Sequence, residues 1–300
     1  MRPAPTSWSF DPLVLLGLAV LLAGYLVAIG PLRRRLGIAE PVARRRLWSY
    51  LGGWAALALV LVSPLDTLGR YYLFAAHTAQ LFLIITLAAP LLLYGLPEWL
   101  VERLLPLRAL RQLTRNLLFT VAAAGIFNAT ILIWHIGPLY EAALRDTTLH
   151  DLQMLCFLVA GLLTWWPIVT PLDRHLRLAS PLQIFYLMLE SLPLDVFGIA
   201  TMFAPYVFYA TYAAAPRVMG LLPPLTDQEV SGGILVVPGN LVDIVIMSVV
   251  FFVWINRMEA AQRAREREQY AAEDAALETA ASSVSPAELP VVQPADRLGG

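Results

Sequence analysis

The sequence predicts an all-α, polytopic membrane protein with seven transmembrane helices. Of its 300 residues, 58% are hydrophobic and 14% are charged, and the mean hydropathy is +0.66. Soluble domains contain about 45–50% apolar and about 25% charged residues. The apolar residues are also gathered into runs of about 20, the length of helix that crosses a hydrocarbon core about 30 Å thick. The charges between these runs are distributed unevenly, as is typical of a membrane protein.

The first apolar run is expected to be a retained anchor. Asp11 precedes it and Arg33–Arg35 follow it, whereas a signal peptide carries its positive charges before the apolar stretch. The other six runs are each long enough to cross the bilayer as a helix. The seven predicted segments are 13–31, 47–64, 72–96, 117–136, 150–170, 182–203 and 234–255.

The later segments have recognisable ends. The fifth closes with Trp165, Trp166 and Pro167, and tryptophan is typical of the membrane–water interface. Four prolines between the sixth and seventh segments, in 204–233, predict that no long helix forms there. A charged, Ala-rich stretch follows the seventh segment and is expected to be helical, while the end of the chain is expected to be disordered. The predicted domains are therefore a membrane domain, 1–256, and a cytoplasmic tail, 257–300.

The basic residues predict the orientation of the chain in the membrane. All 21 are arginine, and most lie in alternate loops, which the positive-inside rule assigns to the cytoplasm. The N-terminus is then outside and the C-terminus inside. The arginines of the predicted cytoplasmic segments are Arg33, Arg34, Arg35, Arg44, Arg45, Arg46, Arg103, Arg108, Arg111, Arg115, Arg174, Arg177, Arg257, Arg263, Arg265, Arg267 and Arg297, and those of the external segments are Arg2, Arg70, Arg145 and Arg217.

Three of the four histidines are predicted to lie at one edge of the membrane. His77, His135 and His150 all fall near external ends of predicted segments, whereas His175 lies in a cytoplasmic loop. Imidazole is the commonest protein ligand of transition metals, so three at one depth form a candidate metal site. Met154 shares a helix face with His150, and a thioether favours a soft cuprous ion. The alternative is that these residues are interfacial anchors and packing residues.

Polar residues inside the segments are costly and commonly mark a function or a partner. Asp195, in the sixth segment, is a candidate to support one of the histidines through a hydrogen bond. An interhelical hydrogen bond is the alternative for Asp195, and it is the interpretation that we favour for Glu190. Gln80 and Gln153 flank the histidines of the third and fifth segments. The lone Cys156 cannot form an intrachain disulfide.

The sequence contains no pattern that predicts catalysis. No nucleophile–base pair is recognisable, so we expect a protein that is not an enzyme. Glycine-rich phosphate loops and basic nucleic-acid patches are also absent from the sequence, and no nucleic-acid partner is expected.

At these residues the chain resembles the CtaG family of bacterial cytochrome c oxidase assembly factors. The resemblance extends from Trp8 to about Trp254, and it rests on the order and spacing of short motifs across the seven segments. These are Trp8 with Asp11-Pro12, Ser63-Pro64-Leu65-Asp66, Ala76-His77 with Gln80, Ala88-Ala89-Pro90-Leu91-Leu92 with Gly95 and Pro97, Trp134-His135, Pro138-Leu139-Tyr140-Glu141-Ala142-Ala143-Leu144, Leu149-His150, Phe157-Leu158 with Gly161-Leu162-Leu163, Trp165-Trp166-Pro167, Tyr209 with Tyr212, Asp227-Gln228, Ser231-Gly232 and Pro238-Gly239.

The resemblance implies a multi-pass protein of the bacterial inner (plasma) membrane that helps the copper-containing respiratory oxidase to mature. Its partners would be cytochrome c oxidase subunits and the lipid bilayer, and its role would be copper delivery or chaperone-like holding of a subunit. The family usually carries two histidine pairs spaced four apart, whose second positions are Leu81 and Met154 here. The expected copper ligands are therefore His77, His135, His150 and Met154, with Asp195 in support. A haem-binding protein, a copper transporter and a metal-free scaffold are the alternatives.

Overall fold

The computed structural model describes residues 2–38, 41–104, 117–169, 178–217, 220 and 222–283, and its regular secondary structure within these ranges is entirely helical. Among the described residues, five helices are long and apolar enough to span a membrane, or up to seven if each of two bent helix pairs counts as one span. The predicted all-α membrane fold is thus confirmed, whereas the orientation in the bilayer stays a prediction.

The first half of the chain forms three of these spans. Helix α1 (Pro12–Val27) continues through the π-helical turn η1 (Ala28–Leu32) into α2 (Arg33–Arg35). Helix α3 (Arg44–Val62) bends by 48° into α4 (Pro64–Tyr71). The third span consists of α5 (Phe74–Leu83), the π-helical turn η2 (Ile84–Ala88) and α6 (Ala89–Gly95), and it is followed by the short α7 (Glu98–Leu104).

The second half begins with α9 (Leu117–Trp134), which bends by 72° into α10 (Gly137–Arg145). Helices α11 (Thr147–Val169) and α12 (Ser180–Phe203) follow, then the single turn α13 (Ala210–Ala213) and the long α14 (Pro224–Ser283). Contacts divide the chain into two units, Met1–Val250 and Phe251–Gly300. The tail beyond Ser283, and also His175, lie outside the described residues.

Prolines explain both the bends and one difference from the predicted boundaries. Pro64 and Pro138 each occupy the first turn of a new helix, where the missing amide hydrogen costs no helical hydrogen bond. Helix α14 begins at Pro224, ten residues before the seventh apolar run, for the same reason. The prediction that 204–233 contains no long helix is therefore correct only for the residues before Pro224. From Pro224 onward it is wrong, because this proline starts α14.

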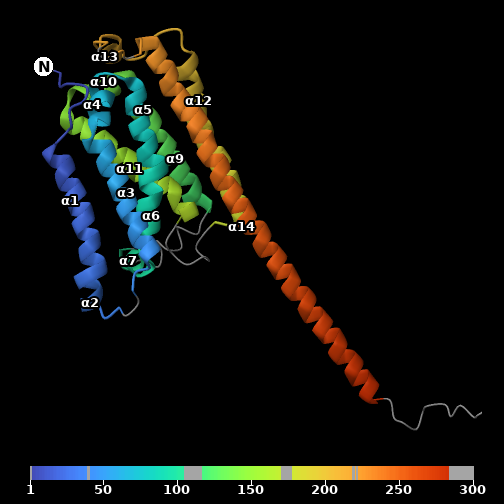
Figure 1. Cartoon of the computed structure of the whole chain (residues 1–300). Coiled ribbons are helices and arrows are strands. Elements are labelled where there is room, and N and C mark those ends of the chain that lie inside the picture. Colours follow the sequence, from blue (N-terminus) through green and yellow to red (C-terminus); the bar gives the residue numbers. More distant parts are fainter. Residues whose placement is uncertain are drawn as a thin grey trace, which may run out of the picture. The chain divides into compact units, whose positions relative to one another are not determined.

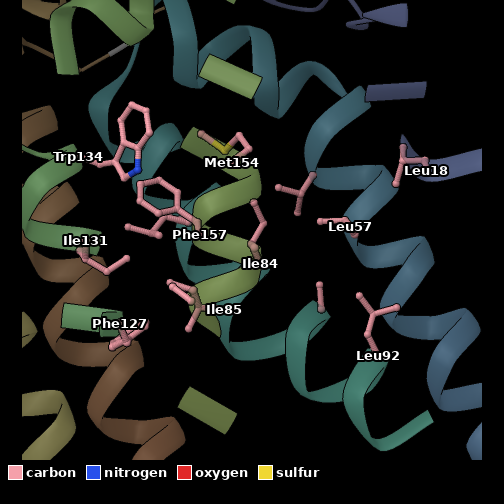
Figure 2. Close-up of a cluster of buried hydrophobic side chains, with 14 of the residues drawn as sticks. Leu18, Leu57, Ile84, Ile85, Leu92, Phe127, Ile131, Trp134, Met154 and Phe157 are labelled. Atoms are coloured by element: carbon pink, nitrogen blue, oxygen red, sulfur yellow. The ribbon is translucent and has the colours of Figure 1, made fainter. Parts of the chain in front are cut away.

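The bends gather short helices at one end of the bundle. Figure 1 shows α4 and α10 at the end where α5 begins, together with α13. The span from α5 to α6 is the most enclosed, with 61% of its most apolar window buried against 17% for α1. An apolar core that includes Leu57, Ile84, Ile131 and Phe157 surrounds it (Figure 2). Residues that α5 presents near its start are consequently shielded from lipid.

Candidate functional site

Three imidazoles lie together in the enclosed end of the bundle. His77 is in the first turns of α5, His135 directly follows α9, and His150 is in the first turn of α11. The ring centroid of His77 is 5.9 Å from that of His150 and 6.3 Å from that of His135. The exposed fractions are 0% for His77, 7% for His135 and 2% for His150. The sequence thus brings three nitrogen-bearing rings into a space closed to solvent.

Four ring nitrogens of this cluster have no hydrogen-bond partner within the described part of the chain. They are both nitrogens of His77, Nε2 of His135 and Nδ1 of His150. The other nitrogen of His135, Nδ1, lies 2.8 Å from the carbonyl oxygen of Ile131. A buried polar group left without a partner costs about 1–3 kcal/mol. Several such groups at one place are therefore suited to a ligand that accepts nitrogen lone pairs.

A buried carboxylate orients His150. Nε2 of His150 is 3.3 Å from Oδ1 of Asp66, on α4, and the same oxygen accepts a hydrogen bond from Nε2 of Gln80 at 3.1 Å. An N–H group directed at a carboxylate fixes the tautomer of the imidazole and leaves the other nitrogen as a lone-pair donor. Asp66 therefore presents Nδ1 of His150 to the cluster.

Glycine allows α4 to approach this closely. A Cβ atom on Gly69 would lie 2.3 Å from Oε1 of Gln80 and 3.0 Å from Cα of His77. Only a residue without a side chain can hold α4 against α5 at this distance. The position of Asp66 beside His150 thus depends on a glycine one turn further along the same helix.

Asp195, the carboxylate expected to support a histidine, has a different partner in the structure, and its supporting role stays a prediction. Asp195 accepts a hydrogen bond from Nδ2 of Asn240 at 2.9 Å, which links α12 to α14, and it lines a cavity together with Glu190 and Asp243. Sequence reasoning did not single out Asp66 as a functional residue. Its only signal was its place in the Ser63-Pro64-Leu65-Asp66 motif.

Glu190 makes an interhelical hydrogen bond, the kind of structural role favoured for it from the sequence. The hydroxyl of Thr164 on α11 donates to its Oε1 at 2.9 Å.

An aromatic layer covers the histidines on the side of the short helices. The ring centroid of Tyr140 is 5.0 Å from that of His77 and 5.4 Å from that of His135. Tyr209 stacks on Tyr140 at 3.9 Å and donates its hydroxyl to the carbonyl oxygen of His135 at 2.8 Å. The Tyr212 hydroxyl lies 3.0 Å from that of Tyr140. Burial raises the pKa of both the Tyr209 and the Tyr212 hydroxyl, so these groups remain protonated donors at neutral pH.

Met154 belongs to the buried face of α11 that also carries His150 and Phe157. Its side chain is part of the apolar core (Figure 2). It also lines a lateral groove of about 440 Å³, together with Leu18 of α1 and Leu57 of α3. The structure therefore assigns a packing role to Met154, and its role as a metal ligand stays a prediction.

The distances decide how a metal ion would fit. A metal–imidazole bond of about 2.0–2.1 Å places the ring centroid about 3 Å from the ion, so two rings on one ion have centroids about 6 Å apart at most. The pairs formed by His77 with His150 and with His135 are at that limit. Within the described ranges, no three His, Cys, Asp or Glu side chains are placed to hold one ion together. An ion shared by two of these rings would therefore require both rings to direct a nitrogen towards it almost in line.

Comparisons with known proteins show which family the chain resembles. Residues 23–257 match the model of the family described as cytochrome c oxidase caa3 assembly factor (Caa3_CtaG). Uncharacterized proteins of Mycobacterium bovis and Mycobacterium tuberculosis are each 29% identical over 245 residues, which is 76% of this chain. The matched region spans only 36% of the length of these two relatives. No solved structure matches the chain.

Proposed function

The chain belongs to the cytochrome c oxidase caa3 assembly factor family, and we propose that it assists oxidase maturation by holding a cuprous ion as cargo at His77, His135 and His150. In this proposal the site faces the outer side of the bacterial inner membrane. The protein catalyses no reaction, and its partners are oxidase subunits that receive the ion within the bilayer.

The observation that carries the proposal is the group of four buried ring nitrogens that have no hydrogen-bond partner among the described residues. Imidazole suits several transition metals, but zinc almost always takes four protein ligands in structural sites. A cuprous ion accepts fewer donors, and His77 has an imidazole on either side of it, with ring centroids 5.9 Å and 6.3 Å away.

Some of the surrounding residues would help to hold the cuprous ion, and others would control its release. Asp66 keeps Nδ1 of His150 available, and the apolar walls around the cluster exclude water. The aromatic layer closes the site through hydroxyl hydrogen bonds to the backbone and between tyrosines. Transfer to a partner would require local opening of this layer, which contains the short α10 and α13 rather than a complete span.

The proposal is tested in cells that lack the native protein. A chain with His77, His135 and His150 replaced by alanine should be expressed at the normal level but should lower both oxidase activity and the copper content of the oxidase. His175→Ala should change neither, because its predicted loop lies on the opposite side of the membrane. Met154→Leu preserves volume but removes the thioether, so lower copper retention without loss of folded protein would identify the sulfur as a further ligand.

A metal-free scaffold is the second candidate, and the absence of a three-ligand group in the described residues favours it. In that case the triple alanine variant keeps full oxidase activity at normal expression, and the histidines serve only in packing. An absorption spectrum of the purified protein tests the haem-binding alternative at the same time, because bis-imidazole haem gives intense visible bands that a cuprous ion lacks.

A further inference from the structure

An apolar lateral groove lies between α1 and α11, with α3 behind it. It has a volume of about 440 Å³, and residues of all three helices line it. Leu18, Leu57 and Met154 are its buried lining residues, whereas Leu152 and Leu155 are exposed. Sites that hold small molecules have volumes of about 300–1,000 Å³ and mostly apolar walls. The groove therefore has the size and lining of a site for one small apolar ligand.

Helix α1 is fixed to α3 and leaves its flank towards α11 open. The indole of Trp54 donates to the carbonyl oxygen of Leu18 at 2.9 Å, and the hydroxyl of Tyr50 donates to that of Leu21 at 3.0 Å. Only 17% of the most apolar window of α1 is buried, and Figure 1 shows this helix at the edge of the bundle. The hydrogen bonds hold α1 in place, so the groove is a fixed gap that a ligand can enter from the bilayer.

The groove has the length of one leaflet of a membrane. Its lining extends from Leu13 to Leu21 on α1 and from Thr148 to Leu158 on α11. At 1.5 Å per residue these stretches are about 12 Å and about 15 Å long, which is half of a hydrocarbon core about 30 Å thick. A partner's transmembrane helix would cross the whole core and is about 10–12 Å wide. A lipid acyl chain ends at the midplane, so its length matches the groove.

Polar groups gather at the end of the groove where α11 begins. Thr148 and Asp151 line it there. Asp11 caps α1 by accepting a hydrogen bond from the amide of Leu13 at 2.8 Å, and its carboxylate is close enough to that of Asp151 for the two to repel each other. The carboxylate of Asp151 forms no hydrogen bond or ion pair with another described residue. This end of the groove is therefore acidic and suited to a cation.

One arginine also acts on Asp151, but its side chain is held by other groups. Arg70 attracts Asp151 electrostatically. Its guanidinium donates to the carbonyl oxygen of Leu144 at 3.4 Å and to the hydroxyl of Thr147 at 2.8 Å, and the residue is buried. The single cation thus faces the two carboxylates of Asp11 and Asp151, which leaves an excess of negative charge at this end.

We propose that the lateral groove binds one glycerophospholipid with an amine headgroup, whose acyl chain lies between α1 and α11 and whose ammonium group lies beside Asp11 and Asp151. The chain fills a gap whose walls otherwise lack contact atoms. Lipid tails are as apolar as leucine, so the apolar walls do not distinguish one headgroup from another, and the carboxylates make the selection. In the predicted orientation the lipid belongs to the outer leaflet. This site is separate from the histidines and does not depend on copper binding.

Lipid binding to the full-length chain in detergent is measured by native mass spectrometry, with phosphatidylethanolamine and phosphatidylglycerol that carry identical acyl chains. The wild type should hold one phosphatidylethanolamine about fivefold more tightly than phosphatidylglycerol, the upper end for an exposed ion pair. Asp151→Asn keeps the size and removes the charge, so this preference should be lost. Asp146→Asn is the matched control, because Asp146 caps the start of α11 through the amide of Leu149, lies outside the groove, and asparagine also caps helices.

Gly17→Leu tests the place of the acyl chain. Nothing lies within 4 Å of a Cβ atom built on Gly17 or on Gly24, and leucine favours helix over glycine, so both positions accept leucine in the folded protein. Gly17 lines the groove, and a leucine there should take the space of the chain and abolish tight binding of both lipids. Gly24→Leu, two turns further along α1 and outside the groove, should bind lipid as the wild type does.

The outcomes separate the headgroup from the groove. Equal affinity of the wild type for the two lipids, or an unchanged preference in Asp151→Asn, would overturn the assignment of the amine headgroup. Tight lipid binding that persists in Gly17→Leu would overturn the groove as its site. Loss of a co-purified oxidase subunit from Gly17→Leu with its lipid still bound would show a partner's helix in the groove and contradict the proposal. Failure of the histidines to bind copper would leave these expected results unchanged.

Discussion

The histidines differ in how firmly the protein holds them. His150 is held by the carboxylate of Asp66 and His135 by a backbone carbonyl, whereas neither nitrogen of His77 has a partner among the described groups. His77 also lies between the other two rings, at about 6 Å from each. A ligand bound at this place would therefore fix His77 most, and the other two rings are already oriented for it.

Asp66→Asn tests the orientation of His150. Asparagine keeps the size of the side chain but replaces the anionic acceptor by a neutral amide, so the hydrogen bond to Nε2 of His150 should weaken. The affinity for cuprous ion, measured by chelator competition, should fall by about tenfold to a hundredfold. Asp195→Asn should have no effect, because Asp195 bonds to Asn240. The reverse pattern would restore the supporting role that the sequence suggested for Asp195.

The sequence predicts the depth of the histidines but not the carboxylate that contacts one of them. The hydropathy pattern alone predicted that three histidines share one depth, because depth follows from position within an apolar run. It could not find Asp66, which lies beyond the end of the second run and reaches His150 only through the bend before α4.

At the scale of elements, the apolar runs located the transmembrane helices but not their interruptions. The π-helical turn η2 and the helix restarts at Pro64 and Pro138 lie within or beside predicted segments. The tryptophan that closes the fifth run has a packing role as well, because Nε1 of Trp165 donates to the carbonyl oxygen of Ile85 in η2 at 2.7 Å. Such bonds form only after tertiary packing, which explains why hydropathy did not reveal them.

Gly69→Ala tests the close approach of α4 to α5. The added methyl group would overlap Gln80 and approach the backbone of His77, and overpacking of this kind costs about 1–3 kcal/mol. The melting temperature in detergent should therefore fall, and copper affinity should fall with it. Gly125→Ala is the control, because nothing lies within 4 Å of its would-be Cβ and alanine favours helix over glycine by about 0.5–1 kcal/mol. Equal melting temperatures for the two variants would contradict the packing argument.

At the scale of the whole molecule, the orientation in the membrane determines which compartment the histidines face. The arginine distribution predicts that reporter fusions after Arg46, Arg115 and Arg177 behave as cytoplasmic, and that fusions near Arg145 and Pro223 behave as external. A paired assay with an alkaline phosphatase and a fluorescent reporter measures this directly. A cytoplasmic result at Arg145 would place the cluster at the inner face and contradict delivery from outside.

Copper binding by the purified chain tests the central claim most directly. The measurement is the number of cuprous ions retained per protein after removal of loosely bound metal, for the wild type, His175→Ala and the variant with alanine at His77, His135 and His150. We predict one ion for the wild type and for His175→Ala, and none for the triple variant with its helical content intact. Equal copper retention by all three proteins, or none by the wild type, would contradict the claim that this cluster holds the ion.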